Sequence, residues 1–153
     1  MSELLDAILN WLTRWIHLLG ATVWVGGYAM MVFAIVPAVA RDPSDRMLTL
    51  AMTAARVLSF AGTVAIVGGA ALIARTRGYG SLLHGEWGGI VVAVVVLSVA
   101  VMALGDSGLR PALRRLAGGD GRAERTAQRW ALVGLLLALL ALAAMTRAPY
   151  ATS

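Results

Sequence analysis

Four long apolar segments alternate with short polar or arginine-rich stretches along the chain. A transmembrane helix needs about 17–25 apolar residues to cross about 30 Å of hydrocarbon, and each segment meets that length. We expect spans at about residues 15–40, 57–74, 87–104 and 130–146. Short connections place successive helices side by side and antiparallel. The pattern therefore predicts an all-α membrane protein, a single-domain antiparallel up-down bundle of four transmembrane helices over residues 1–153.

Helical spacing of apolar residues continues outside the spans. Residues 2–12 are predicted to form an amphipathic lead-in helix at the membrane interface, because leucine and isoleucine recur there three and four positions apart. Residues 47–56 form a helical approach to the second span. In the long connection 105–129 we expect a short interfacial helix over residues 109–116. Aromatic residues near the span ends match the belt found at membrane surfaces: Trp11, Trp15, Trp87, Trp130 and Tyr150.

Arginine is distributed unequally between the two ends of the predicted bundle. Most arginines lie in the first and third connections, whereas Arg14, Arg75, Arg77 and Arg147 lie at the opposite end. The positive-inside rule then makes the arginine-rich connections cytoplasmic and both termini external. The net charge of +5 is explained by this topology. We expect no nucleic-acid partner, because no folded basic domain fits between the helices.

Composition excludes several kinds of chemistry. The chain contains no cysteine, and all thirteen of its Lys and Arg residues are arginine. Disulfides, thiolate ligands, thiol nucleophiles and lysine Schiff bases are therefore excluded. The predicted spans offer few acids or bases, so a stand-alone enzyme is not favoured and proton chemistry would need a cofactor.

The first span carries the best candidate site. Ionisable residues are costly inside a membrane and are functional candidates for that reason. Helical spacing puts Arg14, His17, Gly20 and Trp24 on one face. On such a face an imidazole can bind haem iron, glycine lets the ring approach, an aromatic side chain covers it, and arginine meets a propionate. Alternatively, the small residues serve helix packing and His17 is a hydrogen-bonded interfacial histidine.

His84 is the other histidine of the chain and lies before the third span, on the same predicted side as His17. It is a candidate second axial ligand if its loop folds inward. The alternative is an exposed loop histidine paired with Glu86. On the same side, Arg75 and Arg77 are candidate partners for an anionic ligand or for lipid headgroups.

Two further features leave alternatives open. Arg56 either extends its side chain to the headgroups or pairs inside the bundle with Asp106. Copper could bind through His17, although the methionines are scattered and form no ligand pair at helical spacing.

The pattern Arg14-x-x-His17-x6-Trp24-x-Gly26-Gly27 resembles the opening helix of the CopD-type (copper resistance D) membrane domain. It is also similar to the related HemJ-type protoporphyrinogen oxidases. Two further stretches resemble the second helix and the loop before the third: residues 56–69 and 77–83. The resemblance covers about residues 14–105.

This resemblance implies a protein of the bacterial inner membrane. CopD-type domains are associated with copper handling, and the first-helix histidine of HemJ-type proteins is implicated in haem b binding, which points to His17. HemJ-type proteins also use a lysine in a later helix, so protoporphyrinogen oxidase activity is not expected here. The leading hypothesis is haem b bound through His17 for electron transfer or haem handling, in a homodimer or a subunit of a larger membrane complex. The alternatives are a copper-handling protein and a cofactor-free assembly subunit.

Overall fold

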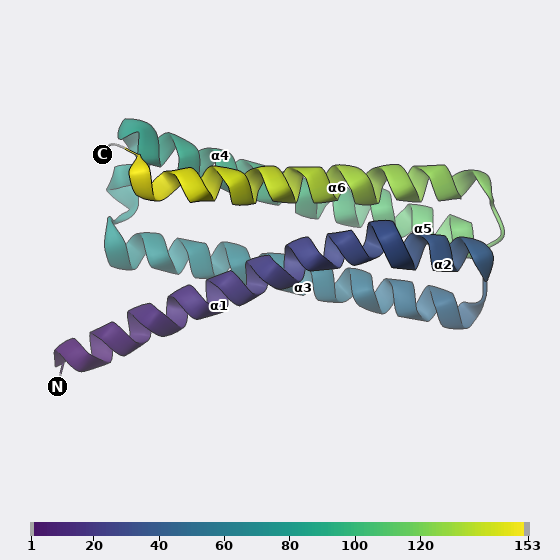
Figure 1. Ribbon diagram of the computed structural model, residues 1–153, viewed down its shortest axis with the longest axis horizontal. Coiled ribbons are helices and arrows are strands. Elements are labelled where there is room, and N and C mark those ends of the chain that lie inside the picture. Colours follow the sequence, from purple (N-terminus) through teal and green to yellow (C-terminus); the bar gives the residue numbers. More distant parts are fainter. Residues whose placement is uncertain (1, 152–153) are drawn as a thin grey trace.

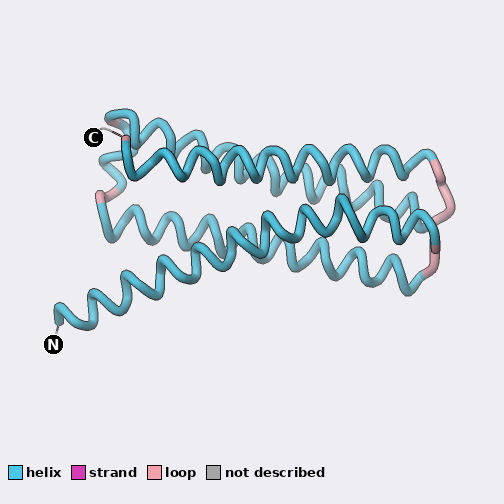
Figure 2. Tube along the Cα trace, viewed as in Figure 1, coloured by secondary structure: helices cyan, strands magenta, loops and turns pink. Residues whose placement is uncertain are grey.

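The computed structural model describes residues 2–151, which form helices joined by short turns (Figure 1). Helices and turns alone make up this part of the chain, with no strand (Figure 2). Four continuous helical stretches are long and apolar enough to cross a membrane: Ser2–Arg41, Asp45–Thr76, Gly85–Ala117 and Arg122–Tyr150. The protein is therefore a multi-pass, all-α four-helix membrane protein, and the predicted fold class is confirmed.

The elements follow one another with few interruptions. In chain order they are α1 Ser2–Met30, η1 Met31–Ile35, α2 Val36–Arg41, α3 Asp45–Thr76, η2 Tyr79–Leu83, α4 Gly85–Leu104, η3 Gly105–Leu109, α5 Arg110–Ala117, α6 Arg122–Arg147 and η4 Ala148–Tyr150. Both termini lie at one end of the bundle, and the turns α2–α3 and α5–α6 lie at the other (Figure 1). Helix α1 crosses α3 obliquely, and its N-terminal part projects from the bundle.

The third and fourth spans are longer than the sequence predicted. The expected connection over residues 105–129 is wrong: helix continues to Ala117, and α6 begins at Arg122. The short helix expected over residues 109–116 is found as α5 Arg110–Ala117, and it continues directly from the third helical stretch without a loop. Leu109, Leu113 and Leu116 are buried there, so this segment packs in the bundle, while Arg114 and Arg115 face outward and Arg110 turns toward α3.

Two helices contain a five-residue π-helical segment immediately before an X-Pro pair. In η1 the N–H of Val36 bonds the carbonyl of Met31, five residues back, and Pro37 has no N–H to donate. The carbonyl of Val32 therefore lacks a partner in its own helix, and the side chain of Gln128 donates to it at 2.9 Å. The same pattern recurs in η3, where Arg110 bonds Gly105 and Pro111 follows.

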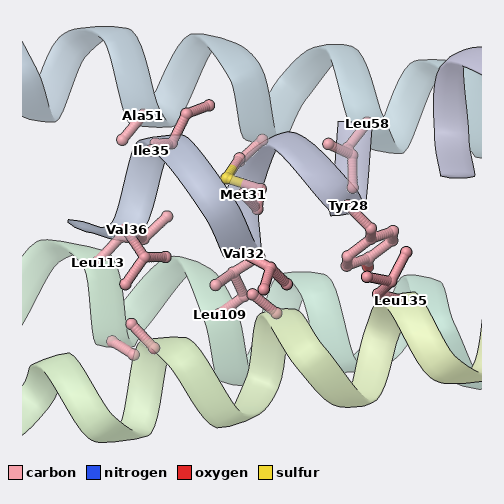
Figure 3. Close-up of a cluster of buried hydrophobic side chains, with 14 of the residues drawn as sticks. Tyr28, Met31, Val32, Ile35, Val36, Ala51, Leu58, Leu109, Leu113 and Leu135 are labelled. Carbon is pink, nitrogen blue, oxygen red and sulfur yellow. The ribbon is translucent and has the colours of Figure 1, made fainter. Parts of the chain in front are cut away.

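The tightest core lies in the half of the bundle nearest the arginine-rich turns. Tyr28, Met31, Val36, Leu109 and Leu113 are almost completely buried there (Figure 3). Their helices carry the two π segments, and the cluster includes residues of α3 and α6 as well. The opposite half, toward the termini, is less tightly filled and contains the cavity described next.

Candidate cofactor site

Close contact between α1 and α3 sets the position of His17. A Cβ atom at Gly20 would lie 2.9 Å from the backbone nitrogen of Ala65. One at Gly68 would lie 3.1 Å from the Cα of His17, and one at Gly62 would lie 2.9 Å from the indole nitrogen of Trp24. Small residues on both helices thus let the backbones approach, as is typical of membrane helix pairs. His17 and Trp24 therefore pack directly against α3.

The imidazole of His17 has a defined hydrogen bond. Its Nδ1 lies 2.7 Å from the carbonyl oxygen of Ala65, and the side chain is partly buried. A carbonyl can only accept, so Nδ1 carries the proton and donates it in this bond. Nε2 then presents a lone pair, which is the arrangement that metal-ligating histidines commonly show. His17 is therefore prepared to act as a ligand through Nε2.

A cavity of about 300 Å³ adjoins His17 and is bounded by α1, α3, α4 and α6. Its wall is almost entirely apolar, with Trp24 and Trp87 as the aromatic members. Leu18 and Leu142 line the cavity although 58% and 45% of their surfaces are exposed, so it opens at the side of the bundle. Cofactor sites in proteins are about 300–1,000 Å³ and mainly apolar, with a few polar groups. This cavity has that character.

The structure brings some of the predicted residues together and separates others. His17 and Trp24 both line the cavity, and Trp24 also meets the ring of Tyr28 edge-on with 6.3 Å between ring centroids. Gly20 does not line the cavity; its place is explained by the contact with α3, the packing alternative considered above. Arg14 is exposed, and within residues 2–151 it forms no ion pair.

His84 lies in a neighbouring pocket rather than in the cavity of His17. That pocket measures about 390 Å³ and is lined by Arg77, Ser81, His84 and Trp87. Nδ1 of His84 is 3.1 Å from the carbonyl oxygen of Gly80, and the side chain is exposed. The alternative pairing of His84 with Glu86 is not seen, because Glu86 binds Arg147 at 3.1 Å.

The arginines near these two pockets have different partners. The guanidinium of Arg77 lies over Trp87, 5.0 Å from the ring centroid, and Trp87 lines both pockets. Arg75 instead bonds Asn10 at 2.7 Å and approaches Asp6 at 3.7 Å, which ties the projecting part of α1 to α3. Arg77 is therefore better placed than Arg75 for an anionic group at the cavity.

Asp106 does not pair with Arg56. Its carboxylate binds Arg110 at 3.0 Å, one helical turn along, and Arg110 also donates to the hydroxyl of Ser59 at 2.8 Å. The cluster joins α3 to the π segment η3. Arg56 is exposed and takes part in none of the ion pairs found in residues 2–151, in agreement with a side chain that reaches toward headgroups.

Three polar or ligating residues of the cavity were not found from the sequence, and one of them is Thr76 of α3. Met145 of α6 and Ser98 of α4 both line it together with His17. Neither belongs to a local motif, and only the packing of α4 and α6 against α1 brings them to the cavity. The thioether of Met145 is, besides His17, the one cavity-lining side chain of a type that commonly ligates haem iron.

Histidine, cysteine and acidic side chains do not gather in groups of three or more that could hold a metal ion in the described part of the chain. A haem needs fewer protein ligands, because its porphyrin supplies four nitrogens and the protein supplies axial ligands only.

Comparisons with models of protein families, with curated proteins and with solved structures found no match to this chain. The fold and the cavity define a four-helix membrane protein with an apolar cavity between its helices. The likeness of the first helix to CopD-type and HemJ-type domains stays a prediction from the sequence.

Alanine at Gly20 is expected to weaken the α1–α3 contact and destabilise the bundle by about 1–3 kcal/mol, because its Cβ would press on backbone atoms that cannot rotate away. Gly26 on the same helix provides the matched control, since a Cβ there has no atom within 4 Å. Gly26→Ala should be neutral or slightly stabilising. Unfolding of both variants in mild detergent under increasing SDS measures the difference, and equal stabilities would contradict the packing role.

Proposed function

We propose that the protein binds haem b through Nε2 of His17 and serves in electron transfer or haem handling. The observation that carries this proposal is the bond from His17 Nδ1 to the Ala65 carbonyl, which leaves Nε2 as the free nitrogen of a side chain that lines an apolar cavity. Bound haem would supply one-electron chemistry at its iron. The chain supplies the ligand, orients it through Ala65, and excludes water with the apolar lining.

The cavity residues match the needs of a haem in three respects. The lining is apolar, as a porphyrin ring requires, and it includes the indoles of Trp24 and Trp87. The cavity opens at the side of the bundle between Leu18 and Leu142, so a ring larger than 300 Å³ would extend through this opening toward the lipid. Met145 can supply a second axial ligand, and it is favoured over His84 because it shares the cavity with His17.

The propionates of a haem need cationic partners. Arg14 lies nearly one helical turn before His17 and is free of ion pairs in the described chain. Arg77 lies on Trp87, which is part of the cavity wall. We assign the propionate contacts to these two arginines, because charge-assisted hydrogen bonds from arginine suit carboxylates.

We further infer that the protein resides in a bacterial inner membrane, with both termini outside and the arginine-rich turns in the cytoplasm. Support comes from the arginine distribution together with the arrangement in Figure 1, where both termini lie at the arginine-poor end. In this orientation the His17 cavity lies in the external half of the bilayer.

A reduced-minus-oxidised absorption spectrum of the detergent-purified protein tests the proposal. Expression in haem-replete cells should give Soret and α bands, with about one haem per chain by pyridine haemochrome assay. Metal analysis of the same sample distinguishes the alternatives. Stoichiometric copper without porphyrin absorbance would favour copper handling, and absence of both haem and copper would favour a cofactor-free assembly subunit.

A further inference from the structure

A third pocket lies at the arginine-rich end of the bundle, far from the His17 cavity along the helices. It measures about 360 Å³ and lies between the end of the third helix, comprising η3 and α5, and the start of α6. Its polar lining comes from Arg115 and Arg122, the carboxylate of Asp120, and the hydroxyl-bearing residues Ser107 and Thr126. The same lining also contains an apolar part next to the indole of Trp130.

The apolar part of the pocket is built by close packing. The ring of Trp130 lies so near to Gly108 that a Cβ there would be 2.7 Å from a ring carbon. Ala112 and Ala123 are buried beside it. Small residues thus line the apolar bottom of the pocket, while Arg115 and Arg122 lie at its exposed edge, here called the rim. The pocket is therefore amphipathic.

The charges at the rim are available to a ligand. The side chains of Arg115 and Arg122 take part in no ion pair within residues 2–151. The one acidic side chain of the pocket, Asp120, already accepts a bond from the backbone N–H of Arg122, the first residue of α6, at 3.0 Å. The two unpaired guanidinium groups leave the rim positive and suited to a phosphate, which arginine binds with paired hydrogen bonds.

We propose that this pocket binds the headgroup of an anionic phospholipid. The position between two membrane-spanning helices, beside an interfacial tryptophan, matches the level of the headgroups. Basic pockets between transmembrane helices are known to bind anionic headgroups in this way. The arginines contact the phosphate, and the first carbons of the lipid lie over the apolar bottom of the pocket at Gly108 and Trp130. This site is independent of the proposed haem site.

Thermal unfolding of the full-length, delipidated protein in neutral detergent measures the binding. Phosphatidylglycerol should stabilise the protein in a saturable way, and phosphatidylcholine with the same acyl chains should not. In the Arg115→Gln/Arg122→Gln double variant the apparent affinity should fall about 30-fold, which corresponds to about 1 kcal/mol for each arginine. If that variant loses helical content by circular dichroism, each single substitution should still lower the affinity about fivefold.

The Arg114→Gln/Arg125→Gln variant is the matched control. It removes the same charge from the same two helices, but neither arginine lines the pocket. Equal loss of affinity in both double variants would show diffuse surface attraction and overturn the proposal. So would equal stabilisation by phosphatidylcholine, or by inorganic phosphate at the same concentration, since the site would then lack lipid selectivity.

Discussion

Alanine at position 17 is expected to abolish the Soret and α bands of the purified protein while the bundle stays folded. The substitution removes the nitrogen that we assign to the iron, so loss of haem should be nearly complete. The cost to the fold should be small, about 1 kcal/mol, because one hydrogen bond to the Ala65 carbonyl is lost at a partly buried site. Absorption spectra and far-ultraviolet circular dichroism on the same samples measure both effects.

His84→Ala is the matched control, because it removes the other histidine of the chain, from a separate pocket. Its spectrum should equal that of the wild type. Met145→Ala should retain haem but lower its reduction potential, since a methionine that held the iron would raise the potential. Retained bands in His17→Ala, or bands lost only in His84→Ala, would refute the assignment of the ligand.

Alanine at Gly134 should be the most damaging of the single glycine substitutions in the bundle core. The added Cβ would overlap the ring of Tyr28, with Cδ1 only 2.7 Å away. Tyr28 has little space to move into, because it is almost fully buried, the void beside it measures only about 10 Å³, and its hydroxyl donates to the carbonyl of Val101 at 3.0 Å. We expect a loss of about 3 kcal/mol, at the upper end of the usual range for overpacking, measured by SDS unfolding.

A double-mutant cycle shows whether this loss comes from the tyrosine ring. In a Tyr28→Leu background the Gly134→Ala substitution should cost much less, because a smaller, more adaptable side chain faces the new methyl group. Gly89→Ala, at a position with no atom within 4 Å of a new Cβ, should leave stability unchanged. Additive losses in the cycle would contradict direct contact between the two positions.

Apolar length alone was sufficient to predict the number and class of the helices. It failed between residues 105 and 129, where arginines interrupt the apolar run: a separate short helix was predicted over residues 109–116, but the helix continues from the third span to Ala117 without a loop. The sequence does contain the apolar side of this helix, because the buried residues Leu109, Leu113 and Leu116 recur there at helical spacing. A window that averages hydropathy cannot separate this face from the long charged side chains opposite it, which reach past the helix to water.

The candidate site was predictable only as far as it lies on one helix. His17 and Trp24 share a face by spacing, and both line the cavity. The partners contributed by other helices were not accessible to local patterns: the Ala65 carbonyl that fixes the imidazole, and Met145 from α6. Gly20 shows a second limit of the sequence. Helical spacing placed it on the same face as His17, but only the structure shows that the backbone of α3, and not a cofactor ring, fills the space beside it.

The paired π segments have a mechanical consequence for the two halves of the bundle. Each proline removes a backbone donor, so the hydrogen-bond ladders of the first and third spans are both interrupted at the same end. A side chain of α6, Gln128, replaces one of the missing bonds from outside the helix. Both interruptions lie beside the tightest core, so packing against α6, and not an unbroken ladder, holds the arginine-rich ends α2 and α5 in line with the rest of their spans.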